Sequence, residues 1–212
     1  MSKSKRKHKR TRRPARRGRR TMRLDGLEDR TLLAADFMPV DVPAAIDPEG
    51  RVPIAPPLPG IVVVEGTEGD DIIPAHVEGD HLFIQVNDVI EIHNANEVDI
   101  IAVWANDGND RVVFDRTVVD QNGIIAAGAG NDSVQGGSGH DYILGGEGND
   151  RSRGGAGNDL IDGDAGNDAI AGNLGHDAML GGLGDDTISG GFGTDAAAGG
   201  SGHAVLRGGP GF

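Results

Sequence analysis

A nine-residue repeat fills residues 127–212 and constrains what this chain can fold into more than any other feature. Its clearest copy, residues 136–144, reads Gly-Gly-Ser-Gly-His-Asp-Tyr-Ile-Leu, which gives the pattern Gly-Gly-x-Gly-x-Asp-x-apolar-x. Ten copies follow in one register from Ala127, and the last is cut off at Phe212. Such a strict period predicts a stack of similar small units, because no single repeat can bury its own apolar face.

The residue types predict one tight turn and one short strand per repeat. Glycines at positions one, two and four allow tight turns with positive φ. Position eight is mostly apolar and lies at the centre of an expected three-residue strand, so the alternation of side chains points it inward. Two repeats would then form one coil of a flattened spiral, with a turn at either edge. The predicted fold class is all-β: a parallel β-roll preceded by irregular strands and a disordered N-terminus. The residues at position eight are Val134, Ile143, Ser152, Ile161, Ile170, Met179, Ile188, Ala197 and Leu206.

The sixth position holds an aspartate in eight successive copies, and stacking brings these carboxylates together along two edges. One edge would hold Asp132, Asp150, Asp168 and Asp186, and the other Asp141, Asp159, Asp177 and Asp195. Carboxylates this close repel one another unless positive charge lies between them, and lysines and arginines are almost absent nearby. A hard cation held by aspartate oxygens and turn carbonyls resolves the repulsion, and Ca²⁺ tolerates flexible all-oxygen sites better than Mg²⁺ does. The turn glycines predicted to join the aspartates as metal ligands are Gly137, Gly139, Gly146, Gly148, Gly155, Gly157, Gly166, Gly175, Gly182 and Gly184.

This pattern resembles the repeats-in-toxin (RTX, haemolysin-type) calcium-binding family. The resemblance covers residues 127–212, and two degenerate upstream copies place Asp71 and Asp110 in the sixth position as further candidate metal ligands. It implies a parallel β-roll that binds several Ca²⁺ ions. Ala204 replaces the aspartate of the ninth copy and is expected to remove a ligand from the last turn. The other departures are Ala127 for the first glycine, Asp164 and Asn173 for the second, and Ser152 and Ala197 in the core.

A disordered tract rich in Gly, Asn and Asp is the alternative, and composition alone would favour it. The apolar residue that recurs at position eight of most repeats argues for the roll instead. Aromatic residues make up only 3% of a chain with 36 glycines, which disfavours a thick globular core. The sequence has no cysteine, which excludes disulfides and thiolate zinc sites, and no apolar run of transmembrane length.

The net charge of −13 combines two opposite segments. Residues 1–23 hold 13 of the 20 lysines and arginines and no acid, so the remainder carries 7 basic and 33 acidic residues, a formal −26. The basic run at residues 5–13 could bind nucleic acid by counterion release. The basic run is accompanied neither by a recognisable nucleic-acid-binding domain nor by aromatic residues that could stack on bases. The acidic remainder of the chain would also repel nucleic acid. We therefore expect a cationic leader and no nucleic-acid partner.

Residues 22–35 resemble the LEPR-XLL leader found at the N-termini of large bacterial surface proteins. The matching residues are Leu27, Glu28, Arg30, Leu32 and Leu33. Asp29 stands where that motif has proline. The resemblance implies export and removal of the leader near Ala35. An ordinary secretory signal is not indicated, because Asp36 interrupts the apolar stretch at residues 32–40. The alternative is a basic tail with a short chance match.

These patterns divide the chain into four segments. They are a basic leader at 1–37, a proline-rich linker at 38–60, an irregular β region at 61–126 and the repeat array at 127–212. Seven of the ten prolines lie in the linker, which favours an extended spacer, with a proline-rich recognition ligand as the alternative. Strands are predicted at residues 61–64, 81–86, 89–93, 98–104 and 118–126, with a hairpin around Asn87-Asp88. This region is expected to cap the open end of the roll.

The sequence favours a non-enzymatic function. His140, His176 and His203 occupy the variable fifth position of their repeats and are predicted to be solvent-facing turn residues, with a zinc cluster as the alternative. No other motif suggests a catalytic group. We expect a secreted or cell-surface protein that folds on binding Ca²⁺ and has a structural or adhesive role, with cell-surface components or self-association as partners. The alternatives are an accessory part or fragment of a secreted RTX enzyme or toxin, and a nucleic-acid binder acting through the leader.

Overall fold

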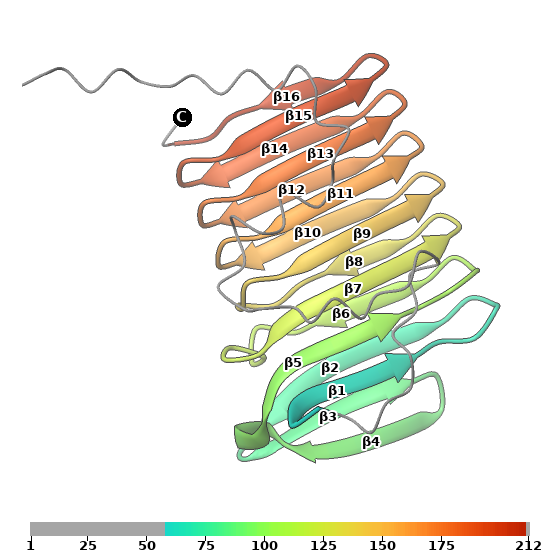
Figure 1. The fold of residues 1–212 in the computed structure, drawn as a ribbon, viewed down its shortest axis with the longest axis vertical. Coiled ribbons are helices and arrows are strands. Elements are labelled where there is room, and N and C mark those ends of the chain that lie inside the picture. The colour runs from blue at the N-terminus through green and yellow to red at the C-terminus, as the bar shows by residue number, and fades with distance from the viewer. Residues whose placement is uncertain (1–57, 211–212) are drawn as a thin grey trace, which may run out of the picture.

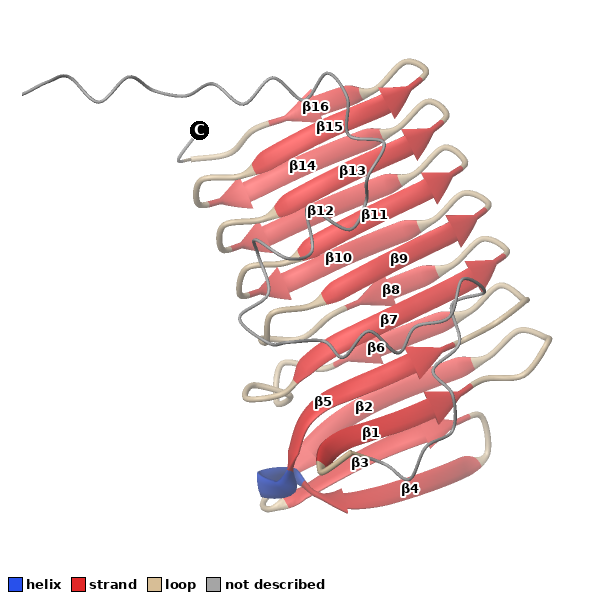
Figure 2. Cartoon of the chain, viewed as in Figure 1, coloured by secondary structure: helices blue, strands red, loops and turns tan. Residues whose placement is uncertain are grey.

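The computed structural model describes residues 58–210, so the predictions for residues 1–57, including the leader, lie outside the described residues. The described chain winds into two facing β-sheets whose strands stack in coils (Figure 1). This confirms the all-β parallel β-roll. The helical content of the described chain is one short 3₁₀ turn at the N-terminal end (Figure 2). No helix within residues 58–210 has the length and apolarity needed to cross a membrane.

From the fourth strand onward, the strands alternate between the two sheets along the chain. One sheet has seven strands in the order β1-β5-β7-β9-β11-β13-β15, and the other has nine in the order β16-β14-β12-β10-β8-β6-β2-β3-β4. The elements are β1 (Gly60–Glu65), β2 (Ile72–Glu78), β3 (His81–Val86), β4 (Val89–Asn94), η1 (Ala95–Glu97), β5 (Val98–Trp104), β6 (Arg111–Phe114), β7 (Asn122–Ala129), β8 (Ser133–Gln135), β9 (Tyr142–Glu147), β10 (Arg151–Ala156), β11 (Leu160–Ala165), β12 (Ala169–Leu174), β13 (Ala178–Leu183), β14 (Thr187–Phe192), β15 (Ala196–Ser201) and β16 (Val205–Arg207).

The register within each sheet shows that two repeats form one coil. Ile161 of β11 pairs with Ile143 on one side and with Met179 on the other, each 18 residues away. In the facing sheet, Ser152 pairs with Val134 and with Ile170 in the same way. Equivalent positions of alternate repeats therefore lie side by side, as the sequence predicts.

Position eight forms the core of the repeat array, as predicted. Ile143, Ile161 and Ile188 are fully buried, and Met179 is nearly so. Ser152 is also buried in this row, and its hydroxyl accepts and donates no hydrogen bond within the described chain. Leu206, in the last described coil, is half exposed.

Most strands are longer than the three residues expected from the sequence. Strands β9 to β15 each have six residues, because the ladder continues past position nine through the first three residues of the next repeat. Glycines that the sequence assigned to turns therefore also pair in the sheets: Gly146, for example, pairs with Gly128 at a φ of 112°. The turn proper is confined to the residues near positions four to six.

The strands before the repeat array belong to the same two sheets. β1 and β5 extend the seven-stranded sheet, β2 and β6 extend the nine-stranded sheet, and all four pair in parallel. The predicted hairpin is confirmed as β3–β4, which pairs antiparallel around Asn87, a residue with a φ of 51°. β7 starts at Asn122, later than the predicted strand, because Val118 closes a turn onto the carbonyl of Asp115 (3.0 Å).

Candidate metal centre

The aspartates at position six form two continuous ladders along the turns. One carboxylate oxygen of each, Oδ1, accepts a hydrogen bond from a backbone N–H one coil earlier; the donor is an aspartate in every case except Asp141, which accepts from Gly123 (2.6 Å). Asp132 donates to Asp150 over 2.8 Å, and Asp141 donates to Asp159 over 2.9 Å. The bonds join residues 18 apart, so the aspartates separate onto the two edges that the sequence predicted.

The second oxygen, Oδ2, is buried and lacks a hydrogen-bond partner in most of these residues. Within residues 58–210 this holds for Asp110, Asp132, Asp150, Asp159, Asp168, Asp177, Asp186 and Asp195. In Asp141, by contrast, Oδ2 accepts a bond from the N–H of Gly137 (2.8 Å). A row of buried carboxylate oxygens without donors is unfavourable unless another positive group supplies the missing interaction.

The unpartnered oxygen lies beside the first glycine of its repeat and a backbone carbonyl of the next coil. A Cβ built on Gly145 would lie 2.5 Å from Oδ2 of Asp150 and 2.7 Å from the carbonyl oxygen of Gly163. The Cβ of Gly163 would meet Oδ2 of Asp168 and the carbonyl oxygen of Gly181 in the same way. Glycine thus leaves a small space where a carboxylate and a carbonyl oxygen converge, and Ca²⁺ prefers such oxygens at about 2.3–2.6 Å.

The glycines predicted as ligands also permit close stacking of the turns. Most of those at positions two and four have positive φ, such as 112° at Gly146 and 122° at Gly148. Gly137 and Gly139 do not, but a Cβ at either would press against a carbonyl oxygen of the preceding coil. The carbonyl oxygens that converge with Oδ2 on the space beside position one belong to first-position glycines, such as Gly163 and Gly181, which are not among the ligands predicted from the sequence. Their signal in the sequence is the recurrence of glycine at position one of most repeats.

The degenerate copies differ from this arrangement. Oδ2 of Asp71 accepts hydrogen bonds from the N–H (2.6 Å) and hydroxyl (3.2 Å) of Thr67, and Asn87 donates its amide to Oδ1. In the copy that contains Ala204, a Cβ on Gly199 would meet the methyl group of Ala204, and no carboxylate is close. Of the described chain, no group of three or more His, Asp or Glu side chains is placed to hold a metal ion by itself. Backbone carbonyl oxygens and water are the other ligands that Ca²⁺ commonly takes in proteins.

Comparison with protein families gives one match to this part of the chain. The RTX calcium-binding nonapeptide repeat (4 copies) matches residues 119–151, 144–179 and 172–206. Residues 119–206 are therefore similar to RTX repeats. Comparisons with curated proteins and with solved structures find no match.

Burial raises the pKa of several carboxylates in these turns. The pKa of Asp159 is raised to about 8 and that of Asp141 to about 7, mainly because burial removes the carboxylates from water. The backbone hydrogen bond to each carboxylate partly offsets this, and the negative charge of neighbouring aspartates adds to the rise for Asp159. Asp150 and Asp177 are raised to about 6 for the same main reason. Each carboxylate therefore favours a bound positive charge, either a proton or a metal ion.

A second ladder runs along position five of the RTX repeats. The side-chain oxygen of Asn131 accepts the N–H of Asn149 (3.0 Å), and Asn149 accepts that of Asn167 (2.9 Å). On the other edge, Nδ1 of His140 accepts the N–H of Asn158 (2.7 Å), and Nδ1 of His176 accepts that of Thr194 (2.9 Å). These histidines are at the surface, as predicted. They also accept hydrogen bonds that connect consecutive coils. The only sign of this role in the sequence was the recurrence of Asn at position five.

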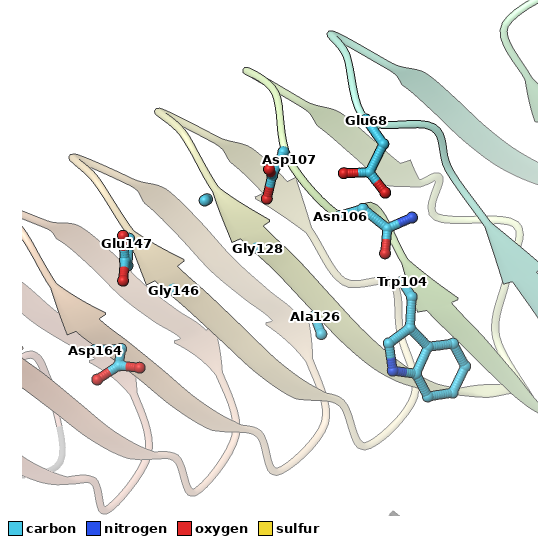
Figure 3. A pocket seen from close by; sticks show the side chains of 10 residues that line it. Glu68, Trp104, Asn106, Asp107, Ala126, Gly128, Gly146, Glu147 and Asp164 are labelled. Carbon is cyan, nitrogen blue, oxygen red and sulfur yellow. The ribbon is translucent and has the colours of Figure 1, made fainter. Parts of the chain in front are cut away.

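A shallow groove of about 440 Å³ lies near the N-terminal coils, apart from the aspartate ladders (Figure 3). Its carboxylates are Glu68, Asp107, Glu147 and Asp164, and Trp104 lies at one end. None of them occupies position six. The groove therefore contains none of the aspartates of the candidate metal sites, although Gly146, a predicted ligand, lines it.

Proposed function

We propose that this chain is a secreted or cell-surface protein whose RTX repeats bind several Ca²⁺ ions and fold as they bind. Its role in this proposal is structural or adhesive, without catalysis. The single observation that carries it is the row of buried Oδ2 atoms without donors, which at Asp150, Asp168, Asp177 and Asp186 lie beside a first-position glycine and a carbonyl oxygen of the next coil. The residues that would hold the ions in the regular part of the array are the position-six aspartates from Asp141 to Asp195, with Asp71, Asp110 and Asp132 as candidates in the copies that depart from the pattern.

Folding would depend on calcium because the protein alone leaves these carboxylates uncompensated. Burying charged oxygens without partners is costly, and fixing a glycine-rich backbone costs additional conformational entropy. An ion that binds the folded form but not the unfolded chain shifts the equilibrium toward the folded form. Extracellular calcium modules bind with dissociation constants of about 10⁻⁴ to 10⁻³ M. The chain would accordingly stay loose before export and become a stiff roll outside the cell.

The proposal is tested by far-UV circular dichroism of the full chain during titration with Ca²⁺, followed by a chelator. We expect a cooperative and reversible gain of β signal near millimolar Ca²⁺, and a much weaker response to Mg²⁺. Asp159→Asn should shift the midpoint to higher Ca²⁺, while Asp88→Asn, in the exposed hairpin turn, should leave it unchanged. A β signal of equal size in calcium and in chelator would contradict the proposal.

The structural or adhesive role needs a separate test. Cells that display the protein should lose it, or lose their attachment to one another, when calcium is chelated. Retention of both after chelation would argue against this role while leaving calcium-coupled folding intact.

A further inference from the structure

The hairpin strand β4 is an exposed edge with an apolar character. It ends the nine-stranded sheet beyond β3, at the N-terminal end of the roll (Figure 1). Its residues Val89, Ile90 and Ile92 are 64%, 58% and 57% exposed. The strand contains no proline and no lysine, the residues that often protect such edges from pairing with another chain.

The pairing with β3 determines which backbone groups of β4 point outward. Ala95 donates its N–H to the carbonyl of Asp80 (2.8 Å), one step beyond the pair of His81 and Asn94. Hydrogen-bonded pairs alternate along an antiparallel ladder, so Val89, Glu91 and His93 direct their backbone groups toward β3. Ile90, Ile92 and Asn94 then direct theirs away from the sheet, where an added strand could bond to them.

A second copy of β4 fits this edge best in one register. Hydrogen bonds between the two backbones form only where the outward-directed residues of one β4 strand face the outward-directed residues of the other. Few antiparallel registers that are symmetric about a two-fold axis meet this condition. A register centred on Glu91 would oppose two identical carboxylates. A register centred on Ile92 places Glu91 opposite His93 of the second copy, twice by symmetry, and Ile90 opposite Asn94. Opposite charges on facing residues stabilise a strand pair, whereas like charges destabilise it.

The same register joins apolar side chains on the outer face of the hairpin. Ile92 lies beside Phe83 in the β3–β4 pair, and the ring of Phe83 stacks on that of His76 with centroids 5.0 Å apart. Pairing centred on Ile92 would bring the Ile92, Phe83 and His76 side chains of the two copies together across the two-fold axis. We propose that two copies of this chain associate through antiparallel pairing of their β4 strands centred on Ile92, which joins the two nine-stranded sheets into one. The proposed surface contains none of the position-six aspartates, so it does not depend on the calcium proposal.

Sedimentation velocity of the full chain in calcium-containing buffer tests this proposal. We expect a reversible equilibrium between monomer and dimer that depends on protein concentration. Ile92→Lys should abolish the dimer, because it places two lysines side by side at the axis. Leu183→Lys, at a leucine that is 60% exposed on another strand, is the matched control and should leave the dimer unchanged. Circular dichroism of each variant establishes that the roll is folded.

Charge exchange tests the register itself. Glu91→Lys and His93→Glu should each weaken the dimer by about tenfold or more, because the first removes the carboxylate that faces His93 and the second places two carboxylates opposite each other. The double variant E91K/H93E restores opposite charges and should recover most of the lost affinity. A monomeric wild-type protein at all concentrations would overturn the proposal, as would a dimer that persists in folded Ile92→Lys. Failure of the double variant to recover affinity would overturn the register.

Discussion

At the residue scale, the position-six aspartate combines two tasks in one side chain. Oδ1 accepts a backbone N–H from the preceding coil and thereby fixes the stacking distance. Oδ2 remains without a donor in most repeats and faces a backbone carbonyl oxygen. An asparagine would keep one acceptor but lose the negative charge. This explains why the repeats need a carboxylate here, whereas asparagine serves well in the position-five ladder.

Ser152→Val should stabilise the folded roll. The hydroxyl of Ser152 is buried between Val134 and Ile170 and has no hydrogen-bond partner within the described chain. Valine replaces the unsatisfied buried hydroxyl by a methyl group and adds a second one, as in the neighbouring Val134, which should raise the free energy of unfolding by about 1–2 kcal/mol. Thermal unfolding in saturating calcium measures this as a higher Tm. Thr187→Val, on an exposed position, is the control, and a Tm for Ser152→Val at or below that of the wild type would contradict the expectation.

Protons and calcium should compete for the same carboxylates. The pKa values of Asp159 and Asp141 are raised from 3.8 to about 8 and about 7 in the calcium-free roll. A carboxyl group whose pKa is raised in the folded state stabilises the fold in its protonated form. This stabilisation is complete below about pH 4, and it is lost as the pH rises through 7 and 8 and the group ionises. Calcium affinity should therefore fall when the pH is lowered from 8 to 6, and binding should release protons.

Calorimetric titration in two buffers with different ionisation enthalpies measures this proton release. The apparent heat of calcium binding should differ between the buffers, and Asp159→Asn should reduce the difference. Heats that are independent of the buffer would show that the carboxylates are already ionised before calcium binds.

At the scale of the element, periodicity allowed much of the architecture to be predicted. The 18-residue register, the two aspartate edges and the β3–β4 hairpin follow from residue spacing and from Asn87-Asp88. The six-residue strands could not be predicted in this way, because the pairing of Gly146 and Glu147 depends on the neighbouring coil rather than on local preference. The sequence did not reveal that both sheets continue into residues 60–114, because the aspartates there are not spaced by 18 residues. Asp71 and Asp110 are 39 residues apart, and Asp110 and Asp132 are 22 residues apart.

The first residue of each repeat should control whether the turn of that repeat binds an ion. Gly145→Ala would place a methyl group 2.5 Å from Oδ2 of Asp150, in the space where the oxygens converge. We expect this variant to lose one bound Ca²⁺, because no ion and methyl group fit there together. By the repeat register, Ala127 already places a methyl group at the equivalent point of the Asp132 turn, so Ala127→Gly should gain up to one ion. Equilibrium dialysis measures both stoichiometries, and an unchanged count for folded Gly145→Ala would contradict this assignment.

At the scale of the whole molecule, the two ends of the roll are stabilised differently. Nine of the twelve largest fully buried side chains lie between Ile73 and Ile125, among them Phe114 and Ile101. The regular repeats after Ala127 contribute only Ile143, Ile161 and Ile188 to that set, while their buried carboxylates lack donors. The N-terminal coils thus resemble an ordinary apolar core, and the C-terminal coils depend on a bound positive charge.

Calcium removal should therefore unfold the roll from its C-terminal coils. Asp71 is already satisfied by Thr67 and Asn87, so the first coils lose little when calcium is absent. Hydrogen exchange measured by mass spectrometry should show that amides in β2, β3 and β5 stay protected in chelator, whereas those in β11 to β15 exchange rapidly. In the presence of calcium, the amides of both sets of strands should be protected from exchange, and this measurement serves as the control. Simultaneous loss of protection in both groups would mean that the roll is one cooperative unit, with the apolar core too small to stand without the ions.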